Sequence, residues 1–220
     1  MVPNYTLDAE ESDNLNAGFV FNRKFGLDWQ SRFDANVFSR VQRDLIRLEA
    51  FGLGELAQFI NEDEITASGL EFSTELSFRN NLRFSGSLTF QELIIAASEN
   101  IEDRSFIDVK LPNIPDFFWN ISTSYTADFG IAENDNVDLF YNLRYVDPFS
   151  VTYVLDEDNA NPQNIIPSQY QHDLGFTYNW DKAYSSITLQ INNLLDAELF
   201  DNYRVPKPGR YIALKVTFSK

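Results

Sequence analysis

The chain of 220 residues contains no cysteine and only one histidine, His172. Without cysteine it can form neither disulfides nor thiolate metal sites, and a single histidine argues against a zinc site. Its apolar runs, such as Leu93–Ala97, are far shorter than the roughly 18 residues of a transmembrane helix. These absences exclude a helical membrane protein, and we expect no cofactor and no bound metal.

Positive charge is also scarce, with 17 Lys and Arg against 33 Asp and Glu and a net charge of -16. No basic stripe is present to neutralise phosphates, which argues against a nucleic-acid partner. The same charge disfavours docking on an anionic cytoplasmic leaflet. Met1–Asp13 is polar and acidic and does not resemble a signal peptide, so we expect an exported chain of this kind to be a fragment or to lack its natural beginning.

Aromatic residues, by contrast, are abundant at 15%, and apolar and polar residues alternate with a period of two. In Ser185–Asn193, for example, Ile187, Leu189 and Ile191 share one face. Such alternation indicates β-strands, and most segments are close to the roughly 9–11 residues that cross a bilayer at barrel tilt. The predicted strands are Asn14–Arg23, Leu27–Leu48, Gly69–Phe78, Leu82–Gln91, Phe117–Tyr125, Val137–Val146, His172–Trp180, Ser185–Asn193 and Tyr211–Phe218.

Short and long connections follow one another in turn. The short ones are Lys24–Gly26, Arg79–Asn81, Gly130–Asn136 and Asp181–Tyr184. The long ones are around Glu49–Leu56 and at Ala96–Asp116, Asp147–Gln171 and Leu194–Arg210. Outer-membrane barrels have short turns at one end and long loops at the other. The pattern therefore predicts an all-β, antiparallel, up-and-down transmembrane β-barrel segment of about nine strands, an odd number that would leave two edges exposed.

Aromatic side chains gather near the predicted strand ends. We interpret them as interfacial girdles, against the alternative of core aromatics beside turns. The residues are Phe25, Trp29, Phe78, Phe117, Phe118, Trp180, Tyr184 and Tyr211.

Charged residues also occur in mid-strand, opposite the apolar faces. In a sandwich they would point to water, whereas in a barrel they would line a polar lumen. The sequence alone leaves both open, but the loop alternation favours the lumen. The candidates for ligand or plug contact are Arg32, Arg40, Glu71, Arg83 and Arg144.

Catalytic and metal-binding patterns are weak in this sequence. Ser168 and Asp173 lie near His172, but no Gly-x-Ser-x-Gly elbow is present, so we predict no enzyme and no catalytic residue. We interpret His172 as interfacial or lumenal. Asn61–Glu64 and Asp156–Asn159 offer oxygen ligands for calcium without EF-hand spacing, and we interpret both as solvated external loops.

Five motifs carry a family resemblance. Ile187–Asp196 resembles a penultimate strand that runs into an Asn-Leu-(Leu/Phe)-Asp turn, and Tyr203–Arg210 resembles a Pro-Gly-Arg lead-in to a final strand. Glu10–Asn14, Ser68–Glu71 and Leu111–Asn120 are similar to earlier strand starts. In this order and spacing they resemble the C-terminal part of the barrel of a TonB-dependent outer-membrane receptor.

We expect structural roles for the motif residues Asn193, Asp196, Pro206, Pro208, Gly209 and Arg210. The two prolines cannot donate to a ladder, so strand pairing should not resume before Gly209. Asn193 and Asp196 can close side-chain turns. The family usually ends on an aromatic residue, whereas here Phe218 is followed by Ser219 and Lys220.

The resemblance implies that residues 1–220 form a single barrel region, incomplete without N-terminal strands and a plug. It further implies a protein in outer-membrane lipid that takes up a scarce nutrient such as an iron–siderophore, a corrinoid or a glycan. Energy would come from the TonB complex through the missing N-terminal part. The alternatives are a small self-contained outer-membrane barrel with a structural or adhesive role and a tenth strand in Asp147–Tyr153, or a soluble secreted β-sandwich that binds a partner.

Overall fold

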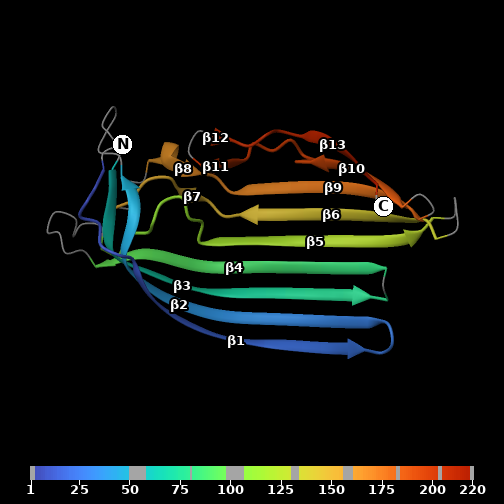
Figure 1. Ribbon diagram of the computed structural model, residues 1–220, viewed down its shortest axis with the longest axis horizontal. Helices are drawn as coiled ribbons and strands as arrows, with labels where there is room; N and C mark the ends of the chain where they lie inside the picture. The colour runs from blue at the N-terminus through green and yellow to red at the C-terminus, as the bar shows by residue number, and fades with distance from the viewer. Residues whose placement is uncertain are drawn as a thin grey trace.

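The computed structural model describes residues 3–49, 58–79, 81–97, 107–129, 134–155, 161–181, 184–202 and 205–218. Its main feature is an antiparallel sheet of nine strands, each paired with the next of the nine (Figure 1). These strands are β1 (Glu11–Phe25), β2 (Trp29–Glu49), β3 (Gln58–Phe78), β4 (Leu82–Ala97), β5 (Phe117–Asp128), β6 (Asn136–Val146), β9 (Gln169–Trp180), β10 (Ser185–Asn192) and β13 (Tyr211–Phe218). The prediction of an all-β, up-and-down sheet of about nine strands is confirmed.

The strand register sorts the two residue classes onto opposite faces. Phe72 of β3 lies opposite Ala35 of β2 and Leu88 of β4. One residue earlier, Glu71 lies opposite Asn36 and Thr89. Because successive side chains of a strand point to opposite faces, this register gives the sheet one apolar and one polar face.

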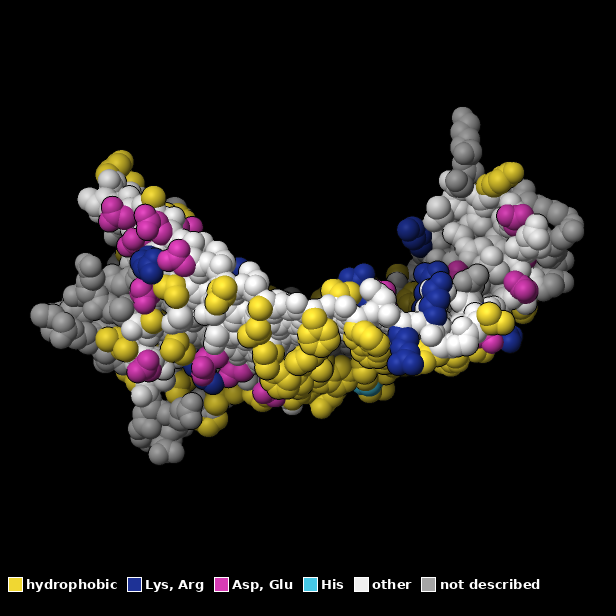
Figure 2. Space-filling model, turned by 90° about the horizontal axis from the view of Figure 1, so that it is seen from below, with side chains coloured by type: hydrophobic (Ala, Val, Ile, Leu, Met, Phe, Trp, Pro, Cys, Tyr) yellow, Lys and Arg dark blue, Asp and Glu magenta, His cyan; other side chains and the backbone are white. Residues whose placement is uncertain are grey.

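The sheet is curved into a trough, and Figure 2 shows hydrophobic side chains gathered along its convex surface. Leu139, Phe176 and Leu189 on this face are 46%, 41% and 45% exposed. The described residues form no second large sheet, and a sandwich would have buried these side chains. The sandwich alternative is therefore wrong. Within the described ranges, no helix has the length and apolar character needed to cross a membrane.

Charged and hydroxyl groups mark both ends of the convex apolar band. Asp135 directly precedes β6 and accepts a hydrogen bond from Tyr178, while Asp147 directly follows β6 and accepts one from Tyr145 at 2.6 Å. From Asp135 to Asp147 the chain rises about 40 Å, which a barrel tilt of about 40° reduces to about 30 Å. That height matches the hydrocarbon core of a bilayer, about 30 Å.

Rings of neighbouring strands meet at both ends of this band. The Trp29 and Phe78 ring centroids are 4.8 Å apart at one end, and those of Phe117 and Phe90 are 4.3 Å apart at the other. Two residues assigned to the girdles lie elsewhere. Phe118 and Tyr211 have the register of the polar face, because each falls one position out of phase with the apolar residues of its strand.

The connections differ strongly between the two ends of the sheet. Tight turns join β1 to β2, β3 to β4 and β9 to β10 at the end shown on the right of Figure 1. The opposite end carries four loop strands, β7 (Phe149–Ser150), β8 (Ile165–Ile166), β11 (Phe200–Asn202) and β12 (Val205–Pro206). We call these the turn end and the loop end.

The β2–β3 hairpin extends further toward the loop end than the sequence indicated. Strand β3 begins at Gln58 instead of Gly69, so Asn61–Glu64 belongs to a strand and the prediction of a solvated loop is wrong there. The Asn61 side chain donates to the carbonyl oxygens of Asp8 and Asp44, at 3.1 and 2.7 Å. Polar residues on both faces of this extension hide the alternation. Asp156–Asn159 lies outside the described residues.

A small hydrophobic core fills the loop end of the trough. Val146, Phe149 and Ile166 are buried together, with Phe118 and Phe200 packed against them. The proposed tenth strand in Asp147–Tyr153 is wrong. Among the described residues, Phe149–Ser150 pairs with Ile165–Ile166 in a separate two-stranded sheet and does not join the nine-stranded one. This core explains why Phe118 can occupy a position on the polar face, because its ring packs against the core residues.

Phenylalanine side chains interrupt the polar face at two further positions, each directly opposite a glycine. Phe140 lies opposite Gly175, and a Cβ added at Gly175 would collide with the Phe140 ring. Phe38 and Gly69 form the same arrangement. Each ring covers the backbone of its glycine, so these phenylalanines pack without disturbing the alternation around them.

Candidate functional site in the concave face

The concave face holds all five charged residues predicted to face a lumen: Arg32, Arg40, Glu71, Arg83 and Arg144. Each has the register of the polar positions of its strand. The structure does not gather them into one site. Arg32 and Arg83 line a hollow near the turn end, Arg144 lines a pocket near the loop end, and the other two make local contacts.

The local contacts join neighbouring strands. Arg40 donates through Nε to Asn14 of β1 at 2.5 Å, and Glu71 accepts from Asn36 of β2 at 3.1 Å. These bonds link adjacent positions of the polar face and do not reach across the trough. Their role in ligand or plug contact stays a prediction.

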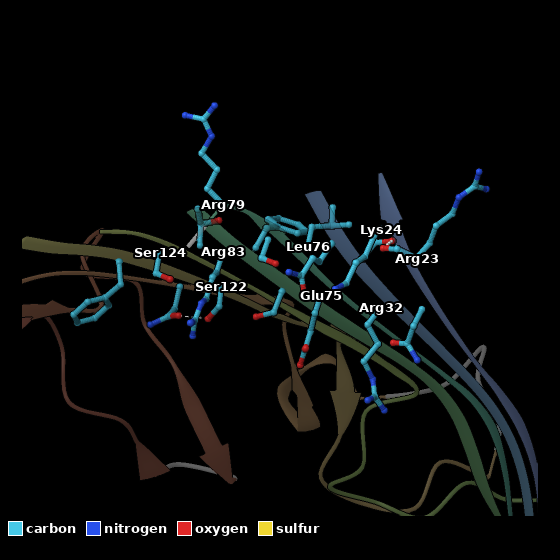
Figure 3. Close-up of a pocket in the computed structure, with 18 residues that line it drawn as sticks. Arg23, Lys24, Arg32, Glu75, Leu76, Arg79, Arg83, Ser122 and Ser124 are labelled. Atoms are coloured by element: carbon cyan, nitrogen blue, oxygen red, sulfur yellow. Dashed lines mark hydrogen bonds between the residues drawn. The ribbon is translucent and has the colours of Figure 1, made fainter. Parts of the chain in front are cut away.

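The turn-end hollow has a volume of about 840 Å³ and is lined by residues of β1 to β6 (Figure 3). Arg32 forms a two-pronged ion pair with Asp34, at 2.9 and 3.0 Å, and lies opposite Glu75 of β3 in the register. Figure 3 shows Arg32 and Glu75 extending to the side opposite Arg79. The hollow is thus a polar surface that carries both signs of charge, suited to contact with polar protein groups or water.

The loop-end pocket is smaller, about 190 Å³, and lies between the sheet and two loops. Arg144 of β6 and Gln171 of β9 are register partners on its floor. Phe149 comes from the loop before β9, and Phe200 and Lys207 come from the loop before β13. The period-two pattern predicts Arg144 but not the loop residues, because their approach to β6 leaves no periodic signal.

His172 lies on the convex face, so its interpretation as lumenal is wrong. It is the register partner of Leu143, and its Nδ1 lies 2.7 Å from the hydroxyl oxygen of Tyr141. Strand β9 begins at Gln169, which places His172 inside the strand and within the apolar band instead of at its edge. No group of three or more potential metal ligands occurs in the described part of the chain.

The family-motif residues build the crossing from β10 to β13. Asn193, 2% exposed and with φ of 51°, exchanges two side-chain hydrogen bonds with the Ala197 backbone, at 2.8 and 2.9 Å. Asp196 accepts from the backbone N–H of Arg210 at 2.7 Å, directly after Gly209. Barrel pairing starts at Tyr211, whereas Pro206 already pairs with Phe200 in a separate ladder, so the expected lack of pairing before Gly209 is wrong in that detail. Pro208 lies between the two ladders, and Tyr203 and Arg204 lie outside the described residues.

A curved antiparallel sheet with an apolar convex face, a polar concave face and its loops at one end defines the wall of a membrane β-barrel. The family model described as "TonB dependent receptor-like, beta-barrel" matches residues 1–194. The chain therefore belongs to the TonB-dependent receptor β-barrel family, whose members are receptors and transporters of the outer membrane.

Solved structures show the same fold. The chain is similar to a copper transporter, OprC, with 19% identity and a TM-score of 0.69, covering 98% of this chain and 32% of OprC. The ferric enterobactin receptor PfeA matches at 20% identity and a TM-score of 0.66, covering 96% and 32% of the respective chains. The ferric-catecholate import receptor Fiu from K12 E. coli matches at 15% and 0.66, covering 97% and 28%. The chain thus spans about a third of the length of these structures, and a search of curated proteins found no match.

Proposed function

We propose that residues 1–220 form one barrel region that supplies wall, external loops and part of the ligand vestibule of a TonB-dependent nutrient receptor. The match of the family model over residues 1–194 carries the proposal. The faces support it, because exposed apolar side chains suit outer-membrane lipid and the concave face offers charged groups to a ligand or plug. Catalysis has no part in this proposal.

The class of nutrient is proposed from the descriptions of the similar solved structures. The similar structures are described as a copper transporter, a ferric enterobactin receptor and a ferric-catecholate import receptor. These descriptions favour a metal or an iron–siderophore over a corrinoid or a glycan. Energy would reach the barrel from the TonB complex through an N-terminal plug and TonB-contacting segment of the kind that the family carries.

Uptake under iron limitation tests the proposal. A strain lacking the gene should take up less radiolabelled iron from at least one ferric siderophore than the parent, and the gene should restore uptake. Deleting TonB should abolish the restored uptake. Equal uptake with and without the gene, across iron, copper, corrinoid and glycan substrates, would refute a role in import.

A further inference from the structure

The loop-end pocket contrasts with the rest of the chain in its charge. The chain has a net charge of -16, yet the described lining residues include two cations, Arg144 and Lys207, and no carboxylate. Asp173, two residues along β9 from Gln171, accepts hydrogen bonds from the Gln171 side chain and from the backbone N–H of Asn193. The carboxylate on this part of the floor is thus already engaged by donors of the protein.

Arg144 is the cation that the fold leaves open to a ligand. Within the described residues it makes no hydrogen bond and no ion pair, although the neighbouring polar positions of the sheet are bonded. Its register partners are the neutral residues Asn120 and Gln171. An arginine carries five donors in a fixed plane, which match the paired oxygens of an anion.

The walls of the pocket are held in place by contacts of their own. Phe149 is 8% exposed within the loop-end core, and Phe200 packs against that core. The backbone N–H of Phe200 also donates to the Gln169 side chain at 2.6 Å, which ties the second loop to β9. The two phenylalanines therefore form a preorganised apolar wall beside a guanidinium group.

The volume limits what can enter. A cavity of about 150 Å³ is enough to hold a benzene molecule. The pocket, at about 190 Å³, therefore has room for one aromatic ring with oxygen substituents, but not for a whole siderophore or a sugar chain.

We propose that this pocket binds one anionic, oxygen-bearing aromatic ring of the imported ligand, a catecholate or aryl carboxylate, with its oxygens on Arg144 and its ring beside Phe149 and Phe200. The inference rests on the proposed receptor function and names the chemistry of its ligand. A ferric complex built from such rings would bind by inserting one of them.

Binding to the complete protein product of the gene, purified from outer membranes in detergent, tests the assignment. The probes are the anionic ferric complex of 2,3-dihydroxybenzoate, the uncharged ferric complex of acetohydroxamate, and inorganic phosphate. Arg144→Gln should weaken binding of the catecholate complex at least about tenfold, the usual effect of losing a charge-assisted bond. Arg144→Lys should keep part of that affinity. Lys215→Gln is the matched control, because Lys215 lies on the same concave face but lines neither hollow.

Three results would overturn the assignment: an unchanged catecholate affinity in Arg144→Gln, an equal loss for both iron complexes, or phosphate binding as tight as that of the catecholate complex. The heat-modifiable gel shift of each variant shows whether its barrel has folded. If the wild-type protein binds no catecholate complex but still restores uptake of another nutrient, the ring assignment fails while the receptor function stands.

Discussion

The convex and concave faces of the sheet share the same strands and the same backbone bonds, yet they follow different rules. On the convex face many large apolar side chains stay exposed, for example 40% at Phe33, 46% at Leu139 and 45% at Leu189. On the concave face polar side chains bond to one another between strands. This difference indicates that one face suits a solvent that offers no hydrogen bonds, and the other suits water or protein.

A charge introduced on each face gives the largest contrast. Ile121 and Ser122 are neighbours in β5, with Ile121 on the convex and Ser122 on the concave face. Ile121→Lys should lower the free energy of unfolding by about 2–4 kcal/mol, the cost of a Lys near the bilayer midplane. Ser122→Lys should cost at most about 1 kcal/mol, for the lost bond to Asn142. Urea unfolding in lipid vesicles measures both, and equal losses would mean that the convex face does not meet lipid.

Sequence alternation predicted both faces because each face meets a uniform environment for most of its height. It failed where that uniformity ends. The β2–β3 extension has polar residues on both sides, so the alternation predicts a strand only from Gly69, whereas β3 begins at Gln58. The polar register of Phe118 depends on loop residues far away in sequence. His172 is hard to place from the sequence because the clear alternation begins only after it, although β9 already begins at Gln169.

The candidate site, too, could be predicted from the sequence only in part. The five lumen candidates could be placed on one face from the alternation alone, because each occupies a polar position of its strand and the strand register keeps polar positions on the same face of the sheet. Their distribution over the turn-end hollow, the loop-end pocket and local contacts could not be predicted, because it depends on the stagger of the strands and on the loops. Gln169 and Phe200 are bonded across 31 residues of sequence, and no local pattern signals such a contact.

The second contrast uses glycines on opposite faces. A methyl group at Gly175 would collide with Phe140 on the concave face, whereas at Gly86 on the convex face the nearest atom is 3.6 Å away. Gly175→Ala should cost about 1–3 kcal/mol through overpacking, and Gly86→Ala should be close to neutral. Adding Phe140→Leu should recover part of the Gly175→Ala loss. If the double variant is as unstable as the single one, the ring is not the cause.

The third contrast concerns the turn after β10, which lies beyond both faces of the sheet. It separates stabilisation by side-chain hydrogen bonds from stabilisation by backbone conformation. Asn193→Ala removes both bonds to Ala197 and leaves a positive φ on a residue with Cβ, so it should cost about 1–2 kcal/mol. Asn193→Gly loses the same bonds but relieves the backbone. Urea unfolding of both variants separates the causes, and a glycine variant no better than alanine would assign the whole effect to the bonds.

The smallest expected effect is a difference between the two faces in the coupling energy of side-chain pairs that join β9 and β10. On the concave face the Thr177 and Thr188 hydroxyls are 2.9 Å apart. A double-mutant cycle with valine at both positions should give a coupling of about 0.5–1 kcal/mol, because either single change leaves one hydroxyl unpaired. The matched convex pair, one residue along each strand, is Phe176 and Leu189. In alanine variants its coupling should be smaller, because lipid tails replace the lost contact almost equally well. A convex coupling as large as the concave one would show that these two side chains pack against protein instead of lipid.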